Sequence, residues 1–598
     1  MSPNPAVEKA FGEVTARRLL SRLILLLVFT SGCLTAPFSI NAQSTRPDRG
    51  TGNGPQHVTD LDNINLQNGS VSMAIPLASL PPVAGGKLGY TLTAHYNSNL
   101  WRAWRSESGG PVDGGLSCPQ MYTTGLIEPV TPPSLQTWMI GEGYKIVFKD
   151  AYLDDFTFIV PSQQCDYYES TWMQGRFFRP VLITPDGGEH EMRIDGTYAT
   201  YHVNGTRSHL SGYYKYLGTP NQPTFSTPTR FYTVDGTYFT AIVNPSSYST
   251  KWTIWAKDGT KIEQMATVQT ITDANGNSIE RGHDSTYNFE YAKDVYTGRM
   301  IKWSNVQYNG NYATQVQYQS TGGSWQSVYV TWGSTTVRGF AYTTTAYDDY
   351  METPCAVDEI IPQTNFTVIR EIEFPNTESG VAAPKYTFSY NSDTSASVTL
   401  TNPKWSCNSI SASYSRTVSD GWGQLSSVTT PSGAVIRYEY TGEGTHDFRD
   451  NGVDNLSQEE ATRHKITSKY IDHDSVTDTW TYSFDEVPGG TAWGAVTAPD
   501  GSTSKEMYSP TNVNFSHLSG YNGQNGLVYR STKPGGIMIE RDWTLLGGTN
   551  LTAFGSFSDK VTYNAVVDTE YTTLLDTDGT TRLKMTAKTF TYDYNGDL

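Results

Sequence analysis

The sequence predicts an all-β protein in which many short antiparallel strands and hairpins form an extended, curled sheet, with sandwich-like packing in the N-terminal part. Three observations support this fold class. Aromatic side chains recur in triplets with a period of two residues, glycine-containing turns follow one another closely, and long amphipathic helical patterns are almost absent. A period of two places side chains on one face of a strand, whereas a helical face needs a period of about 3.6.

The aromatic triplets are the strongest strand signal. Side chains at i, i+2 and i+4 point to one side, and polar residues fill the alternate positions, so each triplet predicts a half-buried strand. The rings would form a ladder on one face of the sheet. The triplets are Tyr287, Phe289 and Tyr291; Tyr386, Phe388 and Tyr390; Ile436, Tyr438 and Tyr440; Trp480, Tyr482 and Phe484; and Phe590, Tyr592 and Tyr594.

Turn residues predict how the strands are joined. Asn204-Gly205 and Asn309-Gly310 each lie between alternating segments, which is typical of a two-residue hairpin loop. Asn275-Gly276 also predicts a type I′ turn. Such closely spaced turns indicate a meander of antiparallel strands.

The N-terminus predicts export. Arg17, Arg18 and Arg22 precede the apolar run 23–29, and Ala42 offers a cleavage site before Gln43. Residues 1–42 are therefore interpreted as a signal peptide, and the mature chain is expected outside the cell or in the cell envelope, with no transmembrane helix. Cys33 leaves a second reading open, in which the protein is an outer-membrane lipoprotein.

Four further regions follow the signal peptide. Residues 43–60 are polar and predict a flexible leader, and 61–180 predict an N-terminal β region with a cysteine-containing insertion. Residues 181–420 predict a central β-meander, and 421–598 a repetitive β-sheet region. Within the N-terminal region, strands are expected over 70–75 and 88–96, with Pro76 interrupting the first.

Cysteine usage agrees with an oxidising compartment. Cys118, Cys165, Cys355 and Cys407 remain after cleavage, and four cysteines allow three connectivities that the sequence cannot separate. The simplest pairing joins the cysteines that are nearest in sequence, Cys118 with Cys165 and Cys355 with Cys407. The alternative is that all four are free buried thiols. No Cys-x-x-Cys spacing points to zinc.

Charge and motifs narrow the function. The net charge of −17 repels phosphate backbones, so nucleic-acid binding is not expected. Neither a nucleophile elbow, a zincin motif, a P-loop nor a dinucleotide fingerprint is present, and we predict no catalytic residue and no cofactor. Asp273, Asn275 and Asn277 place oxygen atoms at alternating positions and are candidate Ca²⁺ ligands, although a simple turn also explains them.

Tryptophans suggest a carbohydrate surface or a core. Flat rings stack on sugar faces, but rings also fill the core of a chain with only 37% hydrophobic residues. A row of exposed rings would favour the carbohydrate surface. The candidate residues are Trp101, Trp104, Trp252, Trp255, Trp422 and Trp543.

Several segments resemble RHS/YD-repeat proteins. The last nine residues, Phe590-Thr591-Tyr592-Asp593-Tyr594-Asn595-Gly596-Asp597-Leu598, are similar to the Y-x-Y-D-x-x-G-x-L centre of a YD repeat, with Asp597 departing from the usual residue. Looser matches lie at 430–440, 272–277 and 64–77. The resemblance covers roughly 60–100 and 420–598 and implies a long antiparallel sheet that spirals into a shell. The chain would be the pre-repeat region of a longer member or a short stand-alone relative. No Asp-Pro pair is present, so the family's self-cleavage is not implied.

These patterns predict an exported, non-enzymatic β-scaffold that acts at the cell surface or outside the cell in a shell, adhesion or toxin-delivery assembly. One alternative is a carbohydrate-binding or adhesive module whose partner is a surface glycan or protein. A second alternative is a secreted glycan-active enzyme, which requires a cleft with two close carboxylates. The sequence does not indicate an oligomeric state.

Overall fold

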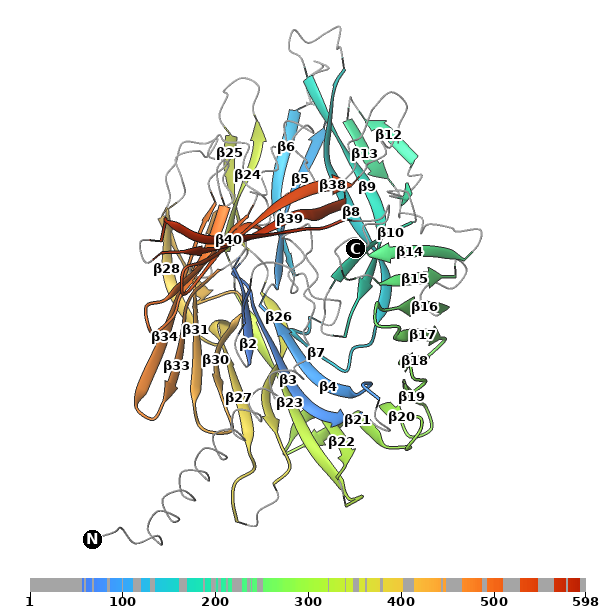
Figure 1. Ribbon diagram of the computed structural model, residues 1–598. Coiled ribbons are helices and arrows are strands. Elements are labelled where there is room, and N and C mark those ends of the chain that lie inside the picture. The colour runs from blue at the N-terminus through green and yellow to red at the C-terminus, as the bar shows by residue number, and fades with distance from the viewer. Residues whose placement is uncertain are drawn as a thin grey trace, which may run out of the picture. The chain divides into compact units, whose positions relative to one another are not determined.

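The computed structural model shows an almost entirely β protein and confirms the predicted fold class (Figure 1). It describes residues 56–58, 61–66, 69–82, 86–98, 100–110, 120–129, 135–160, 169–185, 189–194, 201–202, 206–210, 213–217, 228–233, 237, 239–244, 251–320, 322–338, 340–347, 354–360, 363–376, 380–401, 413–441, 445–447, 465–486, 492–508, 528–546, 564–576 and 579–591. No α-helix lies within these ranges, and none of their segments is a helix long and apolar enough to cross a membrane.

A run of 22 strands forms the main sheet, and each strand pairs antiparallel with the next. In order these are β14 (Thr229–Thr233), β15 (Thr240–Val243), β16 (Lys251–Trp255), β17 (Lys261–Met265), β18 (Val268–Thr272), β19 (Ser278–Asp284), β20 (Phe289–Asp294), β21 (Met300–Tyr308), β22 (Asn311–Gln319), β23 (Trp325–Val337), β26 (Thr364–Glu373), β27 (Lys385–Tyr390), β30 (Leu425–Thr429), β31 (Val435–Tyr440), β33 (Ile466–His473), β34 (Val476–Glu486), β35 (Ala492–Thr497), β36 (Thr503–Tyr508), β37 (Val528–Lys533), β38 (Ile537–Leu546), β39 (Asn564–Leu575) and β40 (Arg582–Thr589). Among the described residues β40 pairs only with β39, and the sheet is not closed.

The other strands form smaller groups. At the β14 edge, β10 (Glu189–Ile194) pairs with β14 and with β9 (Glu169–Ile183), which also pairs with β8 (Lys145–Val160) and β11 (Tyr201–His202). Two-stranded pairs are β5 (Trp101–Gly110) with β6 (Gln120–Pro129), β12 (Thr206–Leu210) with β13 (Tyr213–Leu217), and β28 (Ser395–Thr401) with β29 (Ser413–Ser419). β24 (Phe340–Tyr347) joins β25 (Pro354–Ile360) and β32 (Thr445–Asp447), and η1 (Asn391–Asp393) is a 3₁₀ turn.

A separate five-stranded sheet, which we call the N-terminal sheet, comes from the first part of the chain. Its strands are β1 (Gln56–Val58), β2 (Asp62–Asn65), β3 (Val71–Leu80), β4 (Tyr90–Asn97) and β7 (Trp138–Ile140). β3 lies beside β21 and β22, as Figure 1 shows in blue and green. The buried apolar side chains of the N-terminal sheet belong to the same core cluster as those of the main sheet.

The N-terminal sheet lies against many successive strands of the main sheet. The N-terminal sheet contacts strands from β21, beside β3, to β35, where Gly494 lies against the Leu66 carbonyl. These are ten successive strands of the main sheet, and their nine steps would span roughly 43 Å if flat, whereas four steps across the N-terminal sheet span roughly 19 Å. The smaller sheet therefore contacts a stretch of the main sheet that is wider than its own strand-to-strand width.

The N-terminal sheet differs from the sequence-based expectation at two places. Residues 43–60 were expected to be a flexible leader, but Gln56–Val58 form the edge strand β1 and pair with Asn63–Asn65 of β2. Pro76 was expected to interrupt a strand, but β3 runs through it. The register of β3 against β4 shifts between Pro76 and Ala78, and such a bulge accommodates a residue without an N–H group.

The predicted boundaries at 180 and 420 do not coincide with changes of sheet. The predicted N-terminal region 61–180 contributes to the N-terminal sheet and also supplies β8 and most of β9. The main sheet in turn runs from β14 to β40 through consecutive pairings, so it includes strands on both sides of residue 420.

Five hairpin turns, of which Ser320–Ser324 includes the undescribed position 321, share one hydrogen-bonding pattern. The first residue donates its N–H to the carbonyl of the fifth, and a glycine with positive φ at the fourth position donates to the carbonyl of the first. This pattern is a type I turn followed by a glycine bulge. The turns are Ala256–Thr260, Asp273–Asn277, Ser320–Ser324, Thr430–Ala434 and Ala498–Ser502.

The outcomes of the Asn-Gly predictions follow from backbone angles. Asn309 and Gly310 both have positive φ, 50° and 79°, and join Tyr308 to Asn311, which confirms the two-residue hairpin. The prediction of a type I′ turn at Asn275-Gly276 is wrong, because only Gly276 has a positive φ, 87°, in a longer turn. Asn204-Gly205 lies outside the described residues.

Candidate functional site

The predicted ring ladder faces the core on three strands. Phe388 and Tyr390 of β27, Tyr438 of β31 and Tyr482 of β34 are buried in the main cluster. Tyr386, Tyr440, Trp480 and Phe484 are partly buried and pack against that cluster. On these three strands the rings therefore lie on the buried side of the strand.

The other two triplets do not show this burial of their rings in the core. Tyr287 lies in the turn before β20 and is 75% exposed, and Phe289 and Tyr291 lie on the outward side of β20, while Ala292 fills the buried side. The prediction that this triplet is core-facing is wrong. Phe590 follows the last residue of β40, and Tyr592 and Tyr594 lie outside the described residues.

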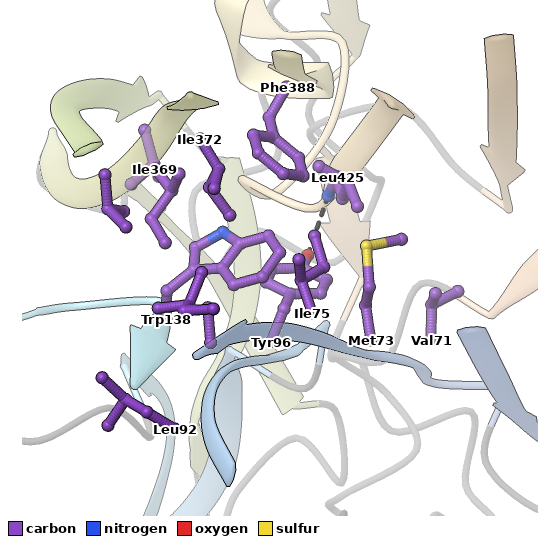
Figure 2. Close-up of a cluster of buried hydrophobic side chains, with 14 of the residues drawn as sticks. Val71, Met73, Ile75, Leu92, Tyr96, Trp138, Ile369, Ile372, Phe388 and Leu425 are labelled. Atoms are coloured by element: carbon purple, nitrogen blue, oxygen red, sulfur yellow. Dashed lines mark hydrogen bonds between the residues drawn. The ribbon is translucent and has the colours of Figure 1, made fainter. Parts of the chain in front are cut away.

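Two rings of the N-terminal sheet meet the inward ladder. Trp138 of β7 is 0% exposed, and its ring centroid lies 5.2 Å from that of Tyr96 on β4 and 5.0 Å from that of Phe388. Figure 2 shows Trp138 and Tyr96 beside Ile75, with Ile369, Ile372, Phe388 and Leu425 facing them from the main sheet. The strand containing Tyr96 was predicted, but no sequence pattern indicated the contacts of Trp138 and Tyr96, because their partners are distant in the chain.

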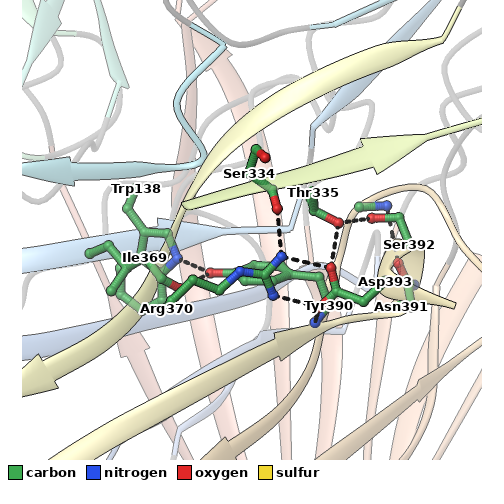
Figure 3. Close-up of polar contacts among 10 residues, drawn as sticks. Trp138, Ser334, Thr335, Ile369, Arg370, Tyr390, Asn391, Ser392 and Asp393 are labelled. Atoms are coloured by element: carbon green, nitrogen blue, oxygen red, sulfur yellow. Dashed lines mark hydrogen bonds and ion pairs between the residues drawn. The ribbon is translucent and has the colours of Figure 1, made fainter. Parts of the chain in front are cut away.

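The hydroxyl of Tyr390 connects the two sheets. It accepts a hydrogen bond of 2.7 Å from Trp138 Nε1 and donates one of 2.8 Å to the Ile369 carbonyl (Figure 3). On the next strand, Leu425 N–H donates to the Tyr96 hydroxyl at 2.8 Å. A buried polar group without a partner would destabilise the fold, so these bonds permit rings with polar atoms in the core.

A charged group supports Tyr390 from the outer side. The Arg370 guanidinium lies 5.2 Å from the Tyr390 ring centroid and binds both carboxylate oxygens of Asp393, at 2.5 and 2.7 Å. Thr335 Oγ1 and the Tyr390 N–H also donate to Asp393, at 2.8 and 2.9 Å. Burial alone would raise the pKa of Asp393, but bonds from Arg370, Tyr390 and Thr335 outweigh it and hold that pKa below its usual range.

A buried ion pair forms a second connection. The Asp62 carboxylate of β2 accepts a hydrogen bond of 2.7 Å from Lys469 Nζ and one of 2.5 Å from the Tyr438 hydroxyl. The Lys469 and Asp62 side chains are 1% and 0% exposed. Lys469 also lies 5.3 Å from the Trp480 ring centroid. Removing one member of such a pair leaves the other charged and desolvated, which is far more costly than losing an exposed pair.

The buried hydroxyls are strongly biased toward the protonated state. Burial first, and the neighbouring Asp62 second, raise the pKa of Tyr438 well above its ordinary value. Burial likewise raises the pKa of Tyr390, Tyr96, Tyr440 and Tyr482. They act as neutral hydrogen-bonding groups where the N-terminal sheet packs against the main sheet. We call this interface the inter-sheet contact.

The predicted Ca²⁺ ligands form a turn. Asp273 Oδ1 accepts the N–H groups of Asn275 and Asn277 at 2.9 Å, and Oδ2 accepts Asn277 Nδ2 at 2.9 Å. The bond from the Asn277 side chain, with the backbone bonds, lowers the pKa of Asp273. No cluster of three His, Cys, Asp or Glu side chains suited to a metal was found in the described part of the chain. Ca²⁺ binding stays a prediction.

The remaining candidates divide between core and undescribed positions. Trp252 and Trp422 are buried, which contradicts an exposed carbohydrate-binding role for them, and Trp543 donates from Nε1 to the Val528 carbonyl at 2.9 Å. Trp255 is partly buried, and the side chains of Trp101 and Trp104 are outside the described part. Cys118, Cys165 and Cys407 lie outside the described residues, as does the side chain of Cys355 in β25, so the disulfide pairing stays a prediction.

We expect Tyr390→Phe to lower the free energy of unfolding by about 1–3 kcal/mol, because it leaves Trp138 Nε1 without its acceptor and the Ile369 carbonyl without its donor. The matched control is Tyr386→Phe on the same strand, whose ring is only partly buried, and which should change stability much less. Urea denaturation followed by circular dichroism measures both. Equal losses in the two variants would contradict the role of the Tyr390 hydroxyl.

We expect Lys469→Met to destabilise the protein by about 3–5 kcal/mol, because Asp62 is then left as a buried carboxylate. The double variant Asp62→Asn, Lys469→Met should recover most of that loss. The control is Arg437→Met, which breaks an exposed pair with Asp472 on the same part of the sheet and should cost less than about 1 kcal/mol. A Lys469→Met loss no larger than the control would overturn the proposed contribution.

Stability should fall as the pH rises above about 10, where tyrosines of the unfolded chain ionise. Folded Tyr390 and Tyr438 keep their protons there, so the folded state binds more protons and the free energy of unfolding decreases with pH. Below that pH these groups leave stability unchanged. Exposed tyrosines should ionise near pH 10, whereas a further part of the tyrosinate absorbance should appear only together with the loss of circular dichroism. Complete titration near pH 10 with an intact spectrum would contradict the burial of these hydroxyls.

No family profile matches the chain, and no curated protein matches it.

Proposed function

We propose that the chain is an exported, non-enzymatic β-scaffold related to RHS/YD-repeat proteins, acting at the cell surface or outside the cell as part of a shell, adhesion or toxin-delivery assembly. The observation that carries this proposal is the filled inner face of the main sheet. Rings of β27, β31 and β34 pack against Trp138 and Tyr96. A face filled in this way supports a rigid wall.

The polar groups of the inter-sheet contact support a structural role. Asp62 is bonded to Lys469 and Tyr438, and Tyr390 is bonded to Trp138 and Ile369. Catalysis requires side chains that reach a bound substrate, whereas these bond to one another inside the core. These groups hold the N-terminal sheet in position against the main sheet.

Repetition of one turn geometry supports a scaffold built from hairpin units. The turns Thr430–Ala434 and Ala498–Ser502 combine a proline at the second position with a glycine at the fourth, and both join consecutive strands of the main sheet. Each unit adds strands without a long connection. A sheet built in this way grows in length while keeping the same cross-section.

Export and rigidity are tested on one preparation. Expressed with its own N-terminus in a bacterial host, the protein should be recovered outside the cytoplasm with Gln43 as its first residue, and Cys33→Ser should leave its fractionation unchanged. Retention of Met1 in a cytoplasmic form would contradict export, and loss of membrane association in Cys33→Ser would indicate the lipoprotein.

The mature protein should resist trypsin, because most strands of its main sheet are paired on both sides, and Lys469→Met should be digested faster at equal protease. Digestion of both proteins at the same high rate would argue against a rigid wall. Release of reducing sugars from a glycan, abolished by a single Asp or Glu substitution, would instead establish the enzyme alternative.

A further inference from the structure

The outward face of β20 to β23 carries a group of rings that the core does not use. On these strands Ala292, Ile301, Val316 and Val328 are buried on the inner side. The alternate residues form a row across four strands in direct register: Tyr291 opposite Lys302, Lys302 opposite Gln317, and Gln317 opposite Ser327. This row points away from the inter-sheet contact.

Two rings, Phe289 and Trp325, flank the ammonium group of Lys302 on this face, and Tyr287 lies beside Phe289. Tyr287 and Phe289 are nearly parallel, with centroids 6.3 Å apart and an interplanar angle of 15°. Lys302 Nζ lies 5.5 Å from the Phe289 ring centroid and 4.5 Å from that of Trp325. Tyr287 is 75% and Trp325 40% exposed. Cation–π contacts with Lys302 hold Phe289 and Trp325 in place, while Tyr287 and Trp325 keep part of their surface exposed to solvent.

Polar side chains lie beside the rings. Gln319 is opposite Trp325 across β22 and β23, and Gln317 is opposite Lys302. Gln315 Nε2 donates to Ser327 Oγ and to the Tyr329 hydroxyl, both at 3.1 Å. The face therefore combines flat apolar surfaces with amide and hydroxyl groups, a mixture that fits a ligand with apolar faces and hydroxyl edges.

Charge disfavours two classes of ligand, polyanions and cations. The chain has a net charge of −17, which disfavours polyanions such as nucleic acids or acidic polysaccharides. Lys302 already occupies the cation position among the rings, which disfavours cationic ligands. An uncharged ligand is complementary to both features.

We propose that the outer face of β20 to β23, with Phe289 and Trp325 flanking Lys302 and Tyr287 beside Phe289, binds a neutral polysaccharide. Sugar rings stack on the aromatic side chains, and the glutamine amides and the Lys302 ammonium hydrogen-bond to hydroxyl groups. This function is independent of the scaffold proposal, because it concerns the face opposite the inter-sheet contact.

Native affinity electrophoresis tests the proposal with hydroxyethyl cellulose and glucomannan as neutral probes and heparin as the anionic probe. At least one neutral polymer should retard the wild-type protein. Trp325→Ala should bind that polymer roughly tenfold more weakly, because an exposed stacking ring is lost. The control is Tyr312→Ala, which removes a 46% exposed ring at the start of β22 from the opposite side of the strand and should bind as the wild type does.

Circular dichroism should show that both variants are folded, as expected for exposed side chains. Three outcomes would overturn the proposal. One is the absence of retardation by either neutral polymer, the second is equal binding by wild type and Trp325→Ala, and the third is retardation by heparin alone that added salt abolishes.

Discussion

The contact between the N-terminal sheet and the inner face of the main sheet is the interaction on which the structure depends. Strands of a single open sheet would expose Phe388, Tyr390, Tyr438 and Tyr482 to water on one side. The N-terminal sheet removes these rings from water, and its own apolar residues are buried by the same contact. Because hydrophobic burial is the main favourable contribution to folding, neither sheet is expected to be stable without the other.

Polar bonds give that contact a single register. Apolar faces pack in several ways at similar energy, whereas a hydrogen bond between buried groups fails when one sheet slides by a residue. Asp62 fixes β2 against β31 and β33, and Trp138 fixes β7 against β27. We interpret the buried ion pair mainly as a determinant of specificity, since its attraction is offset by the desolvation of both charges.

The sequence predicts the local part of this fold better than the long-range part. The period of two identifies β27, β31 and β34 correctly, because it reflects the alternation of a strand between core and solvent. The same pattern at Tyr287, Phe289 and Tyr291 has the opposite orientation, because periodicity shows that side chains share a face but not which face is buried. Trp138 and Tyr390 are 252 residues apart, and no local pattern encodes such a pairing.

The sequence separation of the contacts with the N-terminal sheet constrains the order in which the chain acquires its structure. Asp62 bonds to Lys469, 407 residues later, so the N-terminal sheet is synthesised long before its partner strands exist. At translation rates of roughly 5–20 residues per second, about 20–80 s pass between the synthesis of β2 and that of β33. During this time the apolar face of the N-terminal sheet lacks that partner strand. Contacts of this length form slowly. During that interval the nascent chain depends on chaperones, or on transport in an unfolded form, to avoid aggregation.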